Sequence, residues 1–234
     1  MPSPVAAIDA MLKERHLLKH PFYVAWSNGD VTLPTLQSYA AQYYQFEVNF
    51  PRYIAAAYSH LRRPADRRML LENLMDEEGR SPTHPELWLD FAEGIGASRR
   101  AVRSATPLPA TQQLLDRYEE FGARGAGPAL ASLYAYESIF PEVAAEKSRG
   151  LRAHYGVSDP KAHEFFRVHE GADVEHSRAE RAILTRELQS SRSSPRQAFW
   201  AARQTMGAWW SFLDAFDMPS KGGSSGTARR GVRS

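Results

Sequence analysis

At residues 165–181 the chain reads Phe-Phe-Arg-Val-His-Glu-Gly-Ala-Asp-Val-Glu-His-Ser-Arg-Ala-Glu-Arg. His169, Asp173 and His176 stand at positions i, i+4 and i+7, so a helix places all three on one face over two turns. Two imidazoles and one carboxylate can hold a divalent metal and leave positions open for oxygen or substrate. A solvated polar face explains this stretch equally well on its own. Gly171 favours the metal site, because glycine inside a helix costs about 1 kcal/mol relative to alanine, and we expect it to make room for a close packing partner.

A second stretch with metal-binding residue types is Leu-Met-Asp-Glu-Glu-Gly-Arg-Ser-Pro-Thr-His-Pro-Glu-Leu-Trp, at residues 74–88. Its glycine and prolines argue against one continuous helix. We expect one helix to end near Glu78 and another to begin near His84, with Glu77 and His84 turned inward. Asp76 and Glu78 are expected to be exposed. Taken by itself, an ordinary acidic helix end is the better interpretation of this stretch.

A third stretch, Ala-Ser-Leu-Tyr-Ala-Tyr-Glu-Ser-Ile-Phe at residues 131–140, contains Glu137. An ionised carboxylate rarely lies in such an apolar, aromatic helix unless it is paired or bound to a metal. Together the three stretches supply three carboxylates and three imidazoles, which two divalent ions would nearly neutralise. Helical bundles build carboxylate-rich dinuclear sites in this way. The predicted dinuclear metal centre consists of Glu77, His84, Glu137, His169, Asp173 and His176.

Hydrophobic periodicity is helical almost throughout, and no segment shows strand alternation followed by a hairpin turn. The sequence therefore predicts an all-α bundle of about seven or eight helices. Within it, the segment 33–61 is expected to kink at Pro51. The expected helical segments are residues 5–19, 33–61, 65–78, 85–94, 108–123, 128–155, 159–189 and 195–217.

Composition narrows the classes of function. The 234-residue chain has no cysteine, which excludes disulfides, thiolate metal sites and cysteine nucleophiles. Residues 219–234 hold four basic residues and no acid, so the rest carries 25 basic against 27 acidic residues, and we expect no nucleic-acid partner. No signal peptide or long apolar run is present, so we expect no membrane partner and a cytoplasmic location. The predicted organisation is one domain over 1–218 with a flexible basic tail over 219–234.

Several motifs resemble the haem-oxygenase-like di-metal oxidases, and within them the CADD-like family, named for the chlamydial protein associating with death domains. The resemblance covers about residues 5–218 and implies a haem-oxygenase-like (TenA/PqqC-like) helical bundle. All six positions of the family's metal ligands carry the expected residue types. The motifs are His-Pro-Phe-Tyr-Val-Ala-Trp-Ser-Asn-Gly (20–29), Tyr-Ala-Ala-Gln-Tyr-Tyr (39–44), Asn-Leu-Met-Asp-Glu-Glu (73–78), His-Pro-Glu-Leu-Trp (84–88), Leu-Tyr-Ala-Tyr-Glu-Ser (133–138), Glu-Lys-Ser-Arg-Gly-Leu (146–151) and His-Glu-Gly-Ala-Asp-Val-Glu-His (169–176).

The resemblance implies oxygen-dependent formation of para-aminobenzoate for folate synthesis. In that family the ring is thought to derive from a tyrosine of the protein itself, which matches Tyr23, and the amino nitrogen from a lysine, which matches Lys147. Such a protein would act once. Tyr39 and Tyr136 match further tyrosines, which either relay an oxidising equivalent or wall the pocket. The implied cofactor is a di-iron or mixed iron–manganese centre, with dioxygen and an electron donor as partners, in a homodimer.

Two other functions stay open at this point. The same metal site could oxidise a diffusible substrate such as an amino acid or a fatty acid. Alternatively, the chain could be a non-enzymatic helical protein that binds a partner protein. Other candidate residues are given lesser roles. Packing is expected for Trp26, Tyr43, Tyr44 and Trp88, an inward position without a ligand role for Glu47, and surface or capping positions for His16, His20, His60, His154 and His163.

Overall fold

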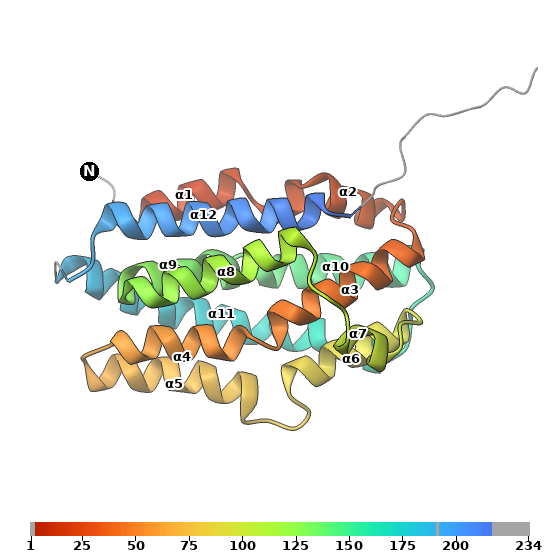
Figure 1. Cartoon of the computed structure of the whole chain (residues 1–234), viewed down its shortest axis with the longest axis horizontal. Coiled ribbons are helices and arrows are strands. Elements are labelled where there is room, and N and C mark those ends of the chain that lie inside the picture. Colours follow the sequence, from red (N-terminus) through yellow and green to blue (C-terminus); the bar gives the residue numbers. More distant parts are fainter. Residues whose placement is uncertain (1–2, 191, 217–234) are drawn as a thin grey trace, which may run out of the picture.

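The computed structural model describes residues 3–190 and 192–216. Over these residues it is an all-α bundle (Figure 1), as the sequence predicts. Its elements are α1 (Pro4–Glu14), a short 3₁₀-helix (Leu17–Lys19), α2 (Pro21–Asn28), α3 (Leu33–Glu47), α4 (Phe50–His60), α5 (Pro64–Glu78), α6 (His84–Gly94), α7 (Arg99–Arg103), α8 (Pro109–Arg124), α9 (Ala126–Glu137), α10 (Phe140–His154), α11 (Pro160–Gln189) and α12 (Pro195–Asp214).

Helix starts follow a repeated local pattern of a capping side chain and a proline. The side chains of Ser3, Thr32, Asp159 and Ser194 each accept a hydrogen bond from a backbone N–H in the first turn of α1, α3, α11 and α12. A proline stands in the first turn of each of these helices, where its missing N–H costs no hydrogen bond. Caps and prolines therefore place the starts of these helices.

The bundle is divided into more helices than the periodicity predicts. The expected segment 33–61 is two helices, α3 and α4, because the chain breaks at Val48 and Asn49 rather than kinking at Pro51. The expected segment 128–155 breaks in the same way before Pro141. Each proline is the second residue of the new helix. Because proline has no N–H, a backbone carbonyl at the end of the preceding helix lacks its usual donor, and that helix ends there. The short helices α2 and α7 were not expected from the sequence.

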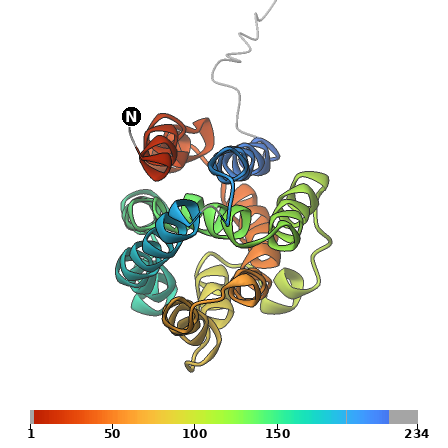
Figure 2. The same cartoon turned by 90° about the vertical axis from the view of Figure 1, so that its left-hand side faces the viewer.

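Helix α9 is the centre of the bundle. All twelve of its residues are buried, and it packs against α4, α8, α11 and α12. Figure 1 shows α1, α2 and α12 along one side and α4 and α5 along the other. In Figure 2, which looks along the bundle, the bright green segment that contains α9 lies near the middle of the molecule. A carboxylate at the end of α9 is therefore held deep inside the protein.

Two further expectations concern the ends of the chain and membranes. In the ranges 3–190 and 192–216, no helix has the length and apolar character needed to cross a bilayer. The predicted basic tail, residues 219–234, lies outside the described residues, so the predicted boundary at residue 218 stays a prediction.

Candidate metal centre

Helix ends bring the candidate ligands together. Glu77 lies in the last turn of α5, His84 is the first residue of α6, and Glu137 is the last residue of α9. Helix α11 adds its face of two histidines and one aspartate, as the sequence spacing predicts. Every one of the six predicted ligand side chains is buried, at most 5% exposed. The expected break between α5 and α6 is what allows Glu77 and His84 to meet.

Five of the six residues fall into two groups that share Glu77. In each group, one candidate ligand atom from every residue lies within 4.8 Å of the others. Nδ1 of His84 is 2.6 Å from Oε2 of Glu77, and Nδ1 of His176 is 3.3 Å from Oε1 of Glu137. If each group held one ion, Glu77 would contribute a ligand atom to both. The groups are Glu47, Glu77, His84 and His169, and Glu77, Glu137 and His176.

The sixth residue, Asp173, adjoins the second group without belonging to it. Its Oδ1 is 3.8 Å from Nδ1 of His176, and its side chain is buried. The ligand role of Asp173 therefore stays a prediction.

The site passes a test of whether its residues fit metal ions. Oε1 of Glu77, Oε1 of Glu47 and Oε2 of Glu137 are buried, and in the described part of the chain none has a hydrogen-bond partner. A buried polar atom without a partner is rare and costly. Here several such atoms converge on shared space, and carboxylate with imidazole is a donor set that suits iron and manganese. The residues therefore fit a dinuclear centre.

Contacts around the ligands hold the imidazoles in place. His169 donates from Nδ1 to the backbone carbonyl of Phe165 at 2.7 Å, which leaves Nε2 for a metal. His176 donates from Nε2 to the carboxylate of Asp76 at 3.1 Å, and Arg80 forms an ion pair with the other oxygen of Asp76. The expectation that Asp76 is exposed is therefore wrong, since it is half-buried and orients a candidate ligand. Glu78 is exposed, as predicted.

Two buried acids near the centre were not recognised as site residues from the sequence. Glu47 joins the first group, although only an inward position was expected for it. Glu180 is fully buried one turn after His176. Both had a signal in the sequence: Glu47 lies in a tyrosine-rich run like that of Glu137, and Glu180 extends the spacing that begins at His169 to i+11.

The carboxylates make the pocket strongly negative when they are ionised. Burial, followed by the charges of neighbouring carboxylates, raises the pKa of Glu47, Asp173 and Glu180 well above the usual range. Burial opposes protonation of His176, but Glu137 and Glu77 outweigh it and raise its pKa to about 9. Such mutual repulsion is relieved by bound cations, which agrees with the fit to metal ions.

The predicted reactive pair lies in the same interior. Nζ of Lys147 is fully buried, lies 5.5 Å from the centre of the Tyr23 ring, and finds no hydrogen-bond partner within the described ranges. Burial lowers the pKa of Lys147 well below its ordinary value, against the opposing charge of Glu47, and so favours the neutral amine. Tyr23 and Tyr39 share a hydrogen bond of 3.0 Å. Tyr39 therefore adjoins Tyr23, and its ring centre lies 5.3 Å from Nζ.

Tyr43 is more than a packing residue. Its hydroxyl hydrogen-bonds to that of Tyr136, and its ring lies 4.7 Å from Nζ of Lys147. It also stacks on Trp88, with ring centres 4.0 Å apart. Tyr43 thus connects the lysine to Tyr136. Trp88, as expected, is a buried packing residue.

The expectations for Gly171 and for the histidines outside the candidate metal centre have different outcomes. A Cβ at Gly171 would meet nothing within 4 Å in the described residues, so the expected close packing partner at this glycine is wrong. The remaining histidines mostly cap helices or lie at the surface, for example His16 and His20, whose rings accept hydrogen bonds at helix starts. His163 is instead buried between Ser148 and the carbonyl of Val157.

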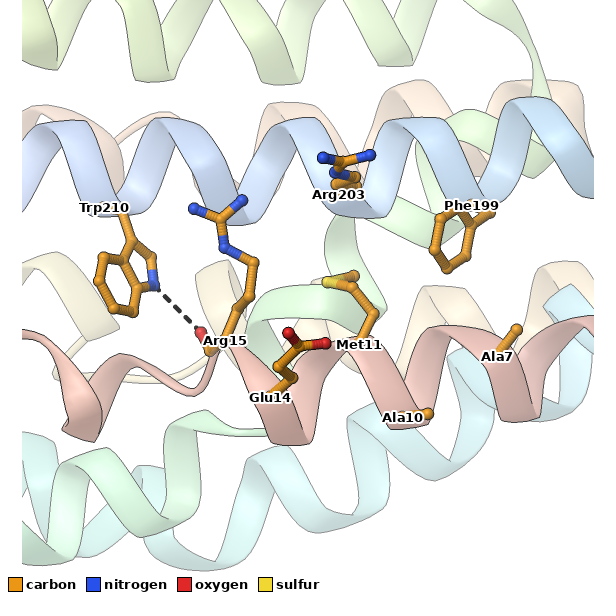
Figure 3. A pocket seen from close by; sticks show the side chains of 8 residues that line it. All are labelled: Ala7, Ala10, Met11, Glu14, Arg15, Phe199, Arg203 and Trp210. Atoms are coloured by element: carbon orange, nitrogen blue, oxygen red, sulfur yellow. Dashed lines mark hydrogen bonds between the residues drawn. The ribbon is translucent and has the colours of Figure 1, made fainter.

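A surface pocket of about 680 Å³ lies elsewhere, between α1 and α12 (Figure 3). Met11, Phe199 and Arg203 are among its lining residues, and Trp210 donates to the carbonyl of Arg15 at its edge. None of the candidate metal ligands lines this pocket. It is therefore separate from the metal centre.

Comparison with known proteins adds independent information. A family model described as iron-containing redox enzyme matches residues 37–210. The 4-aminobenzoate synthase of Chlamydia muridarum is 37% identical over 216 residues, which are 91% of this chain and 89% of that protein. The 4-aminobenzoate synthase of Nitrosomonas europaea is 36% identical over 217 residues, 88% of each chain. The solved structure of a TenA homologue from Pseudomonas syringae superposes with a TM-score of 0.78 at 16% identity, over 91% of this chain and 92% of that one, which shows the shared fold.

Proposed function

Since the chain belongs to the haem-oxygenase-like family of iron-containing redox enzymes that includes the 4-aminobenzoate synthases, we propose that it forms 4-aminobenzoate in an oxygen-dependent reaction. We further propose that the ring comes from its own Tyr23 and the amino nitrogen from its own Lys147. One observation carries this assignment: the amine of Lys147 and the ring of Tyr23 are buried neighbours, 5.5 Å apart, and Glu47 of the first group lies close enough to act on the charge of Lys147.

The chemistry of the two side chains supports the proposal. A tyrosine ring already has para substitution, with carbon at one end and oxygen at the other. Conversion to 4-aminobenzoate needs cleavage of the side chain so that one carbon remains as a carboxylate, and replacement of the phenolic oxygen by nitrogen. The first change oxidises the benzylic carbon, which acid and base groups alone cannot do, so a redox cofactor is required. The second change exchanges oxygen for nitrogen at the same oxidation level of the ring carbon.

The residues that would hold this cofactor are those of the two groups. Glu47, His84 and His169 would bind one ion and Glu137 and His176 the other, with Glu77 between them and Asp173 beside the second. When bound, an iron pair or an iron–manganese pair supplies the redox chemistry with which dioxygen and an external electron donor are used.

The other side chains prepare the reaction. The hydrogen bond between Tyr23 and Tyr39 fixes the direction of the Tyr23 phenol. Burial raises the pKa of the Tyr23 hydroxyl, so the ring stays a neutral phenol, and burial lowers the pKa of Lys147, which favours an amine with a free lone pair. The indole of Trp26 donates to the backbone carbonyl of Lys147 at 3.1 Å and fixes this turn of α10. The surrounding aromatic rings exclude water from the pair.

Isotope labelling tests the source of the ring and of the nitrogen. The protein is produced with ring-deuterated tyrosine or with lysine labelled with ¹⁵N at Nζ, loaded anaerobically with metal, and exposed to air with a reductant. We expect the deuterium or the ¹⁵N to appear in 4-aminobenzoate, at no more than one molecule of product per chain.

Matched variants accompany the labelling. Tyr23→Phe and Lys147→Met are expected to lose product and to keep metal binding, whereas Tyr44→Phe, at a half-buried tyrosine of α3, keeps both. Unlabelled product in excess of the protein, with Tyr23 intact by peptide mass mapping, would instead indicate oxidation of a diffusible substrate and would contradict self-consumption.

A further inference from the structure

A line of aromatic rings runs from the tyrosine pair Tyr43–Tyr136 toward the surface. The rings of Tyr136 and Trp209 are stacked, with centres 4.5 Å apart and planes at 11°. Nε1 of Trp209 donates a hydrogen bond to the hydroxyl of Tyr118 at 3.1 Å. Tyr118 in turn stacks on Tyr53, with ring centres 4.9 Å apart and planes at 23°. Each ring contacts the next, so the line is unbroken.

The inner end of this line lies at the metal centre. Tyr136 directly precedes the candidate ligand Glu137 on α9, and Tyr43 stands one turn before the candidate ligand Glu47 on α3. The ring of Tyr43 is also 4.7 Å from Nζ of Lys147. An electron that leaves or enters the Tyr43–Tyr136 pair is therefore exchanged close to Lys147 and to the candidate metal ligands.

The outer end reaches a surface pocket between α4 and α8. This pocket has a volume of about 450 Å³, and Tyr53 and Tyr118 line it together with Arg52, His60 and Glu119. The Tyr53 ring is almost buried, but it forms part of the pocket wall. A small molecule in the pocket would contact the last ring of the line.

The polar atoms of the line distinguish it from ordinary core packing. The indole N–H of Trp26, Trp88 and Trp210 each donates to a backbone carbonyl, the usual partner of a structural tryptophan. In contrast, Trp209 donates to a tyrosine, and the hydroxyl of Tyr136 bonds to that of Tyr43. The line thus joins easily oxidised side chains to one another through stacking and hydrogen bonds.

We propose that Trp209, Tyr118 and Tyr53 form a one-electron path between the Tyr43–Tyr136 pair and the surface pocket, where a small soluble one-electron reductant binds. The purpose of the path rests on the proposed function, in which tyrosine rings are oxidised in the interior. Its ability to conduct does not, because the same rings are present without metal.

The transfer balances as a simple reduction. A tyrosine of the pair that has lost one electron and its phenolic proton regains one electron through the path and takes back the proton that it released. The reductant in the pocket loses that electron. Trp209, Tyr118 and Tyr53 each give up one electron and regain one, so the only bond formed is the O–H bond of the restored tyrosine.

A photo-oxidation experiment tests the path without relying on turnover. The chain has no cysteine, so Ser59→Cys in the wall of the pocket gives a single site for a ruthenium polypyridyl photo-oxidant. In the full-length protein without added metal, a flash in the presence of a quencher oxidises the ruthenium complex. We expect transient absorption to show an indole radical, lost in Trp209→Phe and in Tyr118→Phe.

Matched controls make the result decisive. Trp210→Phe changes the next tryptophan of α12, and Tyr58→Phe changes a half-buried tyrosine of α4; both are expected to leave the radical signal unchanged. Circular dichroism and melting curves confirm that each variant is folded. The proposal is overturned if no indole radical forms, or if the radical persists in folded Trp209→Phe or Tyr118→Phe. Because no product is measured, these outcomes are independent of whether 4-aminobenzoate is formed.

Discussion

Nε2 of His176 donates a hydrogen bond of 3.1 Å to the carboxylate of Asp76, which joins a buried candidate ligand to a residue at the edge of the bundle. Arg80 holds Asp76 from the solvent side. The contact keeps a proton on Nε2 and turns Nδ1 toward Glu137 and Glu77. Asp76 therefore positions the imidazole of a candidate ligand.

Replacing Asp76 with asparagine tests this role. Partners of this kind change metal affinity by about 10–100-fold, so we expect Asp76→Asn to weaken binding of one metal ion by that order. Anaerobic titration with Mn(II), followed by electron paramagnetic resonance of the free ion, measures the affinity. Glu78→Gln, at the exposed neighbouring acid, is the control and should bind as the parent does. Equal affinities for the parent and Asp76→Asn would remove the positioning role.

Glu77 is shared by both groups of ligands, so its loss should affect two metal ions at once. We expect Glu77→Gln to abolish stoichiometric binding of both ions, whereas His84→Ala removes only the first and Glu137→Gln only the second. Metal content after desalting, by mass spectrometry, gives the number of ions per chain. Retention of one full ion by Glu77→Gln would show that Glu77 does not bridge.

Glu47 provides a separate test of the first group. Since its carboxylate belongs to the group with His84 and His169, Glu47→Gln should selectively weaken one of two ions. The exposed acid Glu72 on α5 offers a control, and Glu72→Gln should behave as the parent does. Calorimetric titration under anaerobic conditions separates the two binding events. Two unchanged events in Glu47→Gln would return Glu47 to a role in packing alone.

The buried Lys147 is expected to lower the free energy of unfolding as well as to supply the reactive amine. Its buried amine has no hydrogen-bond partner among the described residues, and such a group costs about 1–3 kcal/mol. We therefore expect Lys147→Met to raise the free energy of unfolding by about that amount at neutral pH while it abolishes product. Lys13→Met, at an exposed lysine of α1, is the control.

The gain in stability expected for Lys147→Met should also depend on pH. Burial lowers the pKa of Lys147 in the folded protein, whereas the unfolded chain binds its proton with an ordinary lysine pKa. Between these two values the unfolded state carries the extra proton, so the stability of the parent rises with pH. The advantage of Lys147→Met should shrink as the pH approaches the ordinary lysine range, as measured by urea unfolding. A constant difference would mean that Lys147 is charged in the folded state.

The sequence predicts the parts of this site that depend on local spacing. The face of α11 with His169 and His176 follows from the helical repeat, and the inward turn of Glu77 and His84 follows from the glycine and prolines that separate α5 from α6. The place of Glu77 in both groups does not follow from spacing, because it depends on how three helix ends meet. The contact of Asp76 with His176 joins residues 100 positions apart and likewise requires the packed structure.

The fold likewise has features that the sequence predicts and features that require the packed structure. Helical periodicity predicts the bundle, but it does not distinguish a proline that kinks a helix from one that begins the next helix, as at Pro51. Burial of Glu47 and Glu180 depends on which face of α3 and α11 meets α9. Those faces are set by packing between helices that are distant in the chain.

Tyr23 is almost fully enclosed, with the rings of Phe22 and Trp26 and the hydroxyl of Tyr39 around it. If its ring leaves as product, the backbone stays and a cavity the size of an aromatic side chain opens in the core beside α2. Removal of a buried aromatic ring costs about 3–5 kcal/mol, a large share of the stability of a typical domain. A chain that has reacted would thus be weakened from within, and proteases that recognise unfolded protein would remove it in preference to unreacted copies. The supply of product would then follow the rate at which new chains are synthesised.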